Sequence, residues 1–185
     1  MMTASPPRDR RPPPRPLDSA RLEALALAYV ARFATSRAKL EDYLRRKLRE
    51  RGWAGEQDPP VEALGRRFVE LGYIDDEAFA RARTGSLLRR GFGARRVHQA
   101  LAAAGIGEDL RQQVRAAPDE QRRAALALAR KRGFGPFGQD LPDRVRREKQ
   151  LAAMLRAGHP LDSARHLIDA PSLEAAEAWA EQAEE

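Results

Sequence analysis

Cysteine is absent from this 185-residue sequence, and its absence removes several classes of chemistry at once. Disulfide frameworks, thiolate zinc sites and cysteine nucleophiles are all excluded. Aromatic residues are also scarce, at 6%, so the apolar surface of any core must come mainly from leucine, alanine and valine. A composition of this kind favours a helical protein.

Long apolar runs are absent as well. No stretch approaches the roughly 20 apolar residues that a membrane-spanning helix needs. The N-terminus alternates prolines with arginines and has none of the apolar character of a signal peptide. We therefore expect a cytoplasmic monomer without membrane contact. No segment shows sustained alternation of apolar and polar residues, so no sheet is predicted.

Positive charge is in excess and is unevenly distributed. The chain has 34 lysines and arginines against 27 acidic residues, a net charge of +7. We predict that residues 1–17 form a disordered arm rich in proline and arginine. Residues 171–185 contain five glutamates and no basic residue, and we assign them to an acidic tail. The body between these ends is thus more basic than the whole chain, which favours a polyanionic partner.

Three glycines recur at an interval of 53 residues: Gly52, Gly105 and Gly158. Each follows a segment with helical apolar periodicity, in the position that a left-handed helix C-cap occupies. Equal spacing in the same local context predicts tandem repeats of one structural unit.

Each repeat is predicted to contain three helices, because apolar residues return at helical spacing in three segments per unit. We place the units at residues 18–73, 74–117 and 118–170. Asp18 or Ser19 caps the first helix of the chain, and Ser36 caps the second. Units of this size have marginal cores of their own, so neighbours should share apolar surface. The expected fold is all-α: three tandem three-helix repeats forming an elongated, curved helical array.

Motifs that could carry catalysis are better explained structurally. Asp75 and Asp76 precede a helical pattern, where carboxylates cap the helix and complement its dipole. Residues 133–138 fit the dinucleotide pattern G-x-G-x-x-G but follow a helix instead of a strand, and so predict a joint between helices. The three histidines, His98, His159 and His166, share no common face. We predict no enzyme activity, no metal and no cofactor.

Basic clusters are the strongest functional signal. Residues 78–107 contain six arginines and no acidic residue, and shorter clusters stand at residues 45–51 and 122–132. A single cluster is as readily a solvated helix face. Recurrence in all three units favours a basic edge, which could follow phosphates or meet an acidic protein surface. Phe92 and Phe134 are the best-placed aromatic residues, too few for a base-stacking platform.

Two stretches resemble the central signature of RecX proteins. They are Gly72-Tyr73-Ile74-Asp75-Asp76-Glu77-Ala78-Phe79-Ala80 and Arg90-Gly91-Phe92-Gly93-Ala94-Arg95-Arg96-Val97, with Gly105 following. Ser36-Arg37, Leu40 and Leu44 are similar to the family's opening unit, so the resemblance covers about residues 20–117. It implies three tandem three-helix units. It also implies a regulatory protein that binds the RecA recombinase filament on DNA and limits its growth, thereby modulating recombination, DNA repair and the SOS response.

The resemblance also implies roles for particular residues. Arg95 and Arg96 lie inside the matching motif and are the first candidates for contact with the filament or with DNA. Further candidates are Arg90, Arg89, Arg45 and Arg46. The remaining motif positions are expected to set turns, cap helices or pack between them: Gly72, Tyr73, Asp75, Asp76, Phe79, Gly91 and Gly105. The alternative function is an autonomous, basic, helical DNA-binding module.

Overall fold

The computed structural model describes residues 15–140 and 142–182, which form ten α-helices and one short 3-10 helix. The first group contains α1 (Ser19–Arg32), α2 (Arg37–Arg51) and α3 (Val61–Glu70). The second contains α4 (Asp76–Arg89), α5 (Ala94–Ala102) and α6 (Glu108–Gln113). The third contains α7 (Pro118–Arg132), the 3-10 helix η1 (Gly135–Phe137), α8 (Arg144–Arg156), α9 (Leu161–Ile168) and α10 (Leu173–Glu181).

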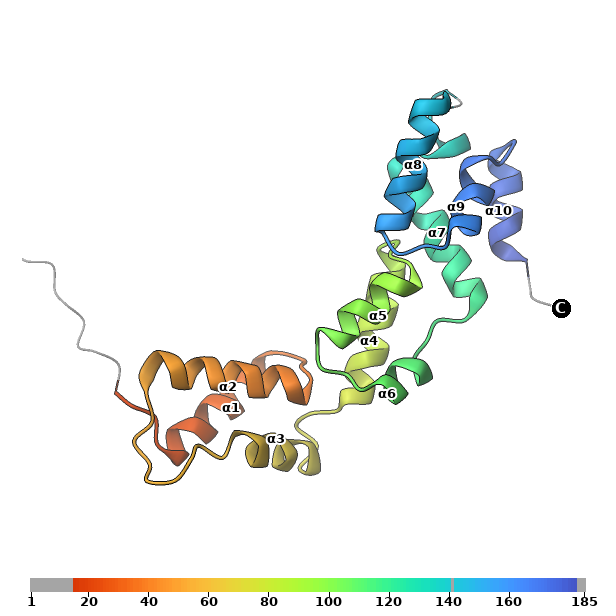
Figure 1. The fold of residues 1–185 in the computed structure, drawn as a ribbon. Helices are drawn as coiled ribbons and strands as arrows, with labels where there is room; N and C mark the ends of the chain where they lie inside the picture. The colour runs from red at the N-terminus through yellow and green to blue at the C-terminus, as the bar shows by residue number, and fades with distance from the viewer. Residues whose placement is uncertain (1–14, 141, 183–185) are drawn as a thin grey trace, which may run out of the picture.

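The three groups follow one another along a bent, elongated molecule (Figure 1). This arrangement confirms the predicted all-α array of tandem three-helix repeats, to which the third unit adds a fourth helix. The described part of the chain contains no β-strand, and its one isolated bridge pairs Leu17 with Trp53. None of its helices has the length and apolar character to cross a bilayer.

Side-chain caps start several helices where the sequence predicts them. Asp18, and not Ser19, caps α1; Ser36 caps α2, and Asp75 caps α4. Each accepts a hydrogen bond from a first-turn N–H group that has no partner within its helix. Asp76 has a different role, because its carboxylate accepts from the backbone N–H of Arg37 at 2.9 Å. The second unit thus caps a helix of the first.

Each unit has its own apolar core. The largest buried side chain, Phe68, lies in the first core together with the apolar stripes of α1 and α2. Ala124 of α7 belongs to the second core, although its helix forms the third unit. The second and third units therefore share apolar surface across their boundary.

Two expectations about the chain ends need correction. Leu17, assigned to the arm, is fully buried, and its backbone pairs with Gly52 and Ala54. Residues 173–181, assigned to the acidic tail, form α10, whose Ala176 and Ala180 are buried in the third core. Alanine contributes to a helix face without making an obvious apolar stripe. Residues 1–14 of the predicted arm lie outside the described residues.

The 53-residue repeat corresponds to a recurring contact between units. Gly105, with φ +71°, follows α5 and lies against the start of α2, where an added Cβ would stand 2.1 Å from the Cβ of Ala38. The buried hydroxyl of Ser36 donates to the Ala104 carbonyl beside it at 2.5 Å. A side chain at position 105 would separate the first two units.

The same contact joins the second and third units. Gly158, with φ +96°, follows α8 and lies against the start of α5, where an added Cβ would be 2.5 Å from the Arg96 nitrogen. The Gly93 N–H donates to the Ala157 carbonyl at 2.9 Å. Gly52, the third glycine of the series, belongs to the first unit, and a Cβ there would meet no atom within 4 Å.

His159 makes the stability of this second junction pH-dependent. Its side chain is buried, with Nε2 3.0 Å from the Gly91 carbonyl oxygen, and burial lowers its pKa below the ordinary 6.5. As the pH falls below 6.5, His159 takes up a proton in the unfolded chain before it does so in the folded protein. The free energy of unfolding therefore decreases as the pH falls from 6.5 to the lower pKa of the folded state.

We therefore expect the free energy of unfolding, measured by urea titration, to decrease between about pH 7.5 and about pH 5.5. The decrease should be smaller in His159→Gln, which cannot bind this proton. Equal pH dependence in the wild type and His159→Gln would contradict the assignment to His159.

Candidate functional site

A cleft of about 540 Å³ lies where the second unit meets the third. Its walls are the end of α4, the start of α5, and the last turns of α7 and α8. The contact between Gly93 and Gly158 holds these elements together. We call it the basic cleft, and its lining residues are Arg90, Phe92, Arg96, Leu128, Lys131, Arg132, Phe134, Ala153, Arg156 and Ala157.

The charge in the basic cleft is entirely positive. Five of its ten lining residues are arginine or lysine, and none is acidic. Within the part of the chain that the structure describes, no aspartate or glutamate forms an ion pair with any of the five. Nearby cations outside the cleft differ, because Arg130 pairs with Glu177 and Arg147 pairs with Asp169. The positive charge of the cleft is therefore left for an external anion.

Two phenylalanines add apolar surface to the cleft. Phe92 lies in the turn between α4 and α5, and the Arg90 guanidinium stands 5.4 Å from its ring centroid. Phe134 follows α7 and packs against the third core. Both rings are partly buried. In such an arrangement the cations can contact phosphates, and the half-exposed rings can contact the adjacent bases.

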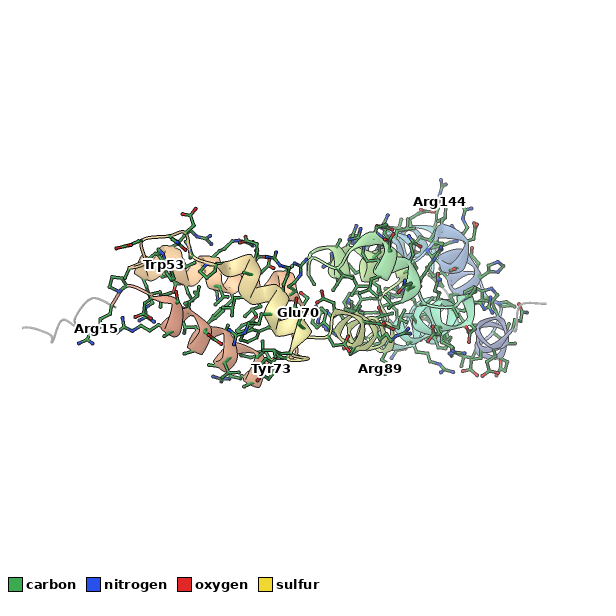
Figure 2. The ribbon with its side chains drawn as sticks, turned by 90° about the horizontal axis from the view of Figure 1, so that it is seen from below. Arg15, Trp53, Glu70, Tyr73, Arg89 and Arg144 are labelled. Atoms are coloured by element: carbon green, nitrogen blue, oxygen red, sulfur yellow. The ribbon has the colours of Figure 1, made fainter. Side chains whose placement is uncertain are left out.

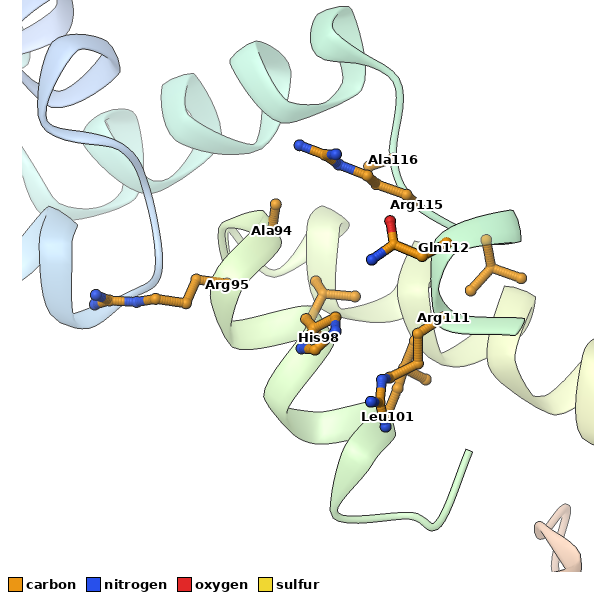
Figure 3. Close-up of a pocket in the computed structure, with 10 residues that line it drawn as sticks. Ala94, Arg95, His98, Leu101, Arg111, Gln112, Arg115 and Ala116 are labelled. Atoms are coloured by element: carbon orange, nitrogen blue, oxygen red, sulfur yellow. The ribbon is translucent and has the colours of Figure 1, made fainter. Parts of the chain in front are cut away.

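The structure brings together two of the six arginines that the sequence suggested. Arg90 and Arg96 both line the basic cleft. Arg95 points away from α5 toward the third unit (Figure 3), where its guanidinium donates to the Leu155 carbonyl. Arg89 is exposed at the end of α4 (Figure 2) but does not line the cleft. Arg95 thus holds the two units together, and its neighbour Arg96 faces the cleft.

Arg45 and Arg46 lie in the first unit, on α2, and line no part of the basic cleft. Arg45 forms ion pairs with Glu41, Asp42 and Glu62, and its hydrogen bond to Glu62 raises its pKa further. Its charge is already compensated inside the unit. Arg46 pairs at 3.8 Å with Glu50 and lies over the Tyr43 ring.

The motif residues have mainly structural roles. Gly72, Gly91 and Gly105 all have positive φ and occupy turns after helices. Phe79 packs partly against the second core. Tyr73, expected to pack between helices, is instead 53% exposed, with its ring 5.3 Å from that of Phe68.

Other polar groups do not assemble into a metal centre. No cluster of three or more potential metal ligands occurs among the described residues. His98 pairs with Glu108, whose pKa is lowered to about 2 by hydrogen bonds from Gln112, Arg111 and His98. His166 stacks on Trp179. Residues 133–138 join α7 to α8 through η1, which confirms the predicted joint between helices.

Sequence reasoning did not find Arg156. It lies 60 residues after Arg96 and is flanked by no other basic residue, so no cluster draws attention to it. Packing α8 against the start of α5 brings it to the cleft. The 53-residue repeat predicted contact between units, but the repeat gave no sign of which charges the contact would bring together.

Comparison with known proteins identifies the family. The family model described as the second three-helix domain of RecX matches residues 75–114. A regulatory protein RecX from Myxococcus xanthus is 33% identical over 165 residues, covering 84% of this chain and 88% of that protein. The chain belongs to the RecX family. The RecX of Deinococcus radiodurans is 42% identical over 129 residues, which cover 68% of this chain and 58% of that protein.

Solved RecX structures agree with the fold. A crystal structure of RecX from Lactobacillus salivarius superposes with a TM-score of 0.61 at 18% identity, covering 78% of this chain and 90% of that one. A second structure, of a regulatory protein RecX, gives a TM-score of 0.62 at 22% identity, covering 82% of this chain and 73% of that one. The relatives in Myxococcus xanthus and Deinococcus radiodurans are both described as regulatory proteins.

Proposed function

We propose that this protein binds the RecA recombinase filament on DNA and limits its growth, with the basic cleft contacting the phosphate backbone. In this role it acts in the cytoplasm, as a monomer, in recombination, repair and the SOS response. The observation that carries the proposal is the set of five cations in one cleft without an acidic partner among the described residues. The resemblance to RecX proteins supports the recombinase as the partner.

The chemistry of the cleft favours phosphates over an acidic protein surface. Phosphates recur at short intervals along a strand. When several cationic side chains neutralise them, the counterions that surrounded these phosphates are released. The five cations come from the end of α4 and from α5, α7 and α8, which surround one cleft. A strand that passes through the cleft would meet cations on several sides. Arg90, Arg96 and Arg156 can also donate two hydrogen bonds each to one phosphate.

The test is RecA-dependent ATP hydrolysis on single-stranded DNA. A filament regulator should suppress hydrolysis at concentrations far below those needed to coat the DNA, because binding at a growing filament end blocks many later additions. An autonomous DNA-binding module should inhibit only by competing for the strand, at stoichiometric coverage. Suppression confined to coating concentrations would favour that alternative. Absence of any effect on the cognate filament would refute the proposal.

A further inference from the structure

A second groove, of about 530 Å³, lies where the first unit meets the second. It is formed by the turn between α1 and α2, the turn between α3 and α4, and one face of α4. It shares no residue with the basic cleft. We call it the α4 groove, and its lining residues are Ala34, Thr35, Gly72, Tyr73, Ile74, Asp75, Ala78, Phe79, Ala82, Arg83 and Ser86.

The α4 groove combines small side chains on α4 with an exposed aromatic ring. Ala78, Ala82 and Ser86 stand four residues apart on α4 and form a stripe of small side chains, beside which Phe79 and Arg83 also line the groove. Tyr73, which lines the groove, is 53% exposed. Small residues on a helix let a second helix approach closely, and exposed large apolar side chains typically mark interaction sites.

Two charged side chains line the α4 groove, Asp75 and Arg83. The Asp75 carboxylate is held at the start of α4 by the Ala78 N–H, and the neighbouring Asp76 accepts from the Arg37 N–H. Glu77 pairs with Arg81. Arg83 lines the groove and forms no ion pair within the described residues. An occupant that pairs with Arg83 would carry a carboxylate.

The third unit shows how an acidic helix fits a helix with small residues. There α10, which contains three glutamates, packs on α7, the first helix of its unit. The small residues Ala176 and Ala180 of α10 share a core with Ala125 and Ala129 of α7. Glu177 of α10 pairs with Arg130 of α7. On α4, the first helix of the second unit, the groove face carries small residues and Arg83 but no fourth helix covers it.

We propose that the α4 groove docks an acidic amphipathic helix of the partner protein. The inference rests on the proposed function, which makes RecA that partner. Small residues of the incoming helix pack on Ala82, its apolar side chains meet Tyr73 and Phe79, and a glutamate or aspartate pairs with Arg83. The molecule then contacts the filament twice: through phosphates at the basic cleft and through protein at the α4 groove.

Ala82→Glu tests the docking. The variant places a bulky carboxylate on the groove floor, and the alanine is exposed on a helix, where glutamate is well tolerated. Ala63→Glu makes the same change at an exposed position of α3 outside the groove. Binding is measured by fluorescence anisotropy to bare single-stranded DNA and to the RecA filament on that DNA, together with the thermal unfolding midpoint.

We expect Ala82→Glu to weaken filament binding by about tenfold or more. Its affinity for bare DNA should remain unchanged, and Ala63→Glu should match the wild type in both measurements. Tyr73→Ser, with Val145→Ser as the control at another exposed apolar residue, should show the same selective loss without added charge. If Ala82→Glu does not fold, the comparison of Tyr73→Ser with Val145→Ser tests the docking instead.

Filament binding equal to wild type in folded Ala82→Glu or Tyr73→Ser would overturn the proposal. A wild-type dimer in sedimentation, lost in Ala82→Glu, would also overturn it and assign the groove to a second copy of this chain. If the wild type binds bare DNA but does not bind the filament, the proposed function itself fails. That outcome differs from a groove failure, in which the wild type and both groove variants bind the filament alike.

Discussion

Replacing Arg90 and Arg96 together by glutamate is expected to weaken binding to the RecA filament and to single-stranded DNA by about 100-fold at moderate salt. Both side chains line the basic cleft and have no carboxylate partner among the described residues, so their charge is available to phosphates. Reversal removes two phosphate contacts and adds two repulsions. The measurement is equilibrium binding by anisotropy, with inhibition of RecA ATP hydrolysis as the functional readout.

The matched control reverses two exposed arginines outside the cleft, Arg66 and Arg144. It makes the same change in net charge, so a loss confined to the cleft variant identifies a local contact. The slope of log affinity against log salt concentration should also decrease by about two in the cleft variant, because two fewer counterions are released. Equal losses in both variants would show that only total charge matters.

Gly93→Ala is expected to destabilise the protein by about 2 kcal/mol or more and to disrupt the cleft as well. A Cβ at position 93 would stand 2.4 Å from the backbone of Gly158, which no rotamer change can relieve. The second and third units must therefore move apart at the contact that holds the cleft walls together. Urea unfolding measures the loss of stability, and DNA binding under conditions where the variant is folded measures the loss of the cleft.

Gly107→Ala is the control for this substitution. Its φ is −61°, and an added Cβ would meet no atom within 4 Å. Alanine there should cost only about 0.5 kcal/mol, because Gly107 is the N-cap of α6, a position that favours glycine over alanine. If Gly93→Ala matched Gly107→Ala in unfolding free energy and in DNA binding, the close contact between the units would not be required for stability or for the cleft.

Helix positions were predictable because they depend on local chemistry. The caps at Ser36 and Asp75 act within three residues, and apolar periodicity acts within a few turns. The packing of α10 into the third core was missed because its buried face is made of Ala176 and Ala180, which no apolar stripe reveals. Leu17 was missed because its burial depends on pairing with Gly52, 35 positions later.

The candidate site was only partly predictable, because it depends on contacts distant in the sequence. Arg90 and Arg96 could be found from the family motif, whereas Arg156 reaches the cleft only through packing of α8. The cluster containing Arg45 suggested a contact, but Glu62, 17 residues away, compensates its charge. Local charge density therefore identifies candidate surfaces, and the fold decides which of their charges remain available.

Photo-crosslinking shows directly whether DNA lies in the basic cleft. A photoreactive amino acid at Ala153, which is half-buried in the wall of the basic cleft, is compared with one at exposed Ala63 on α3. With the RecA filament assembled on labelled single-stranded DNA, we expect DNA adducts from position 153 and none from position 63. DNA adducts from position 63 with none from position 153 would contradict this expectation.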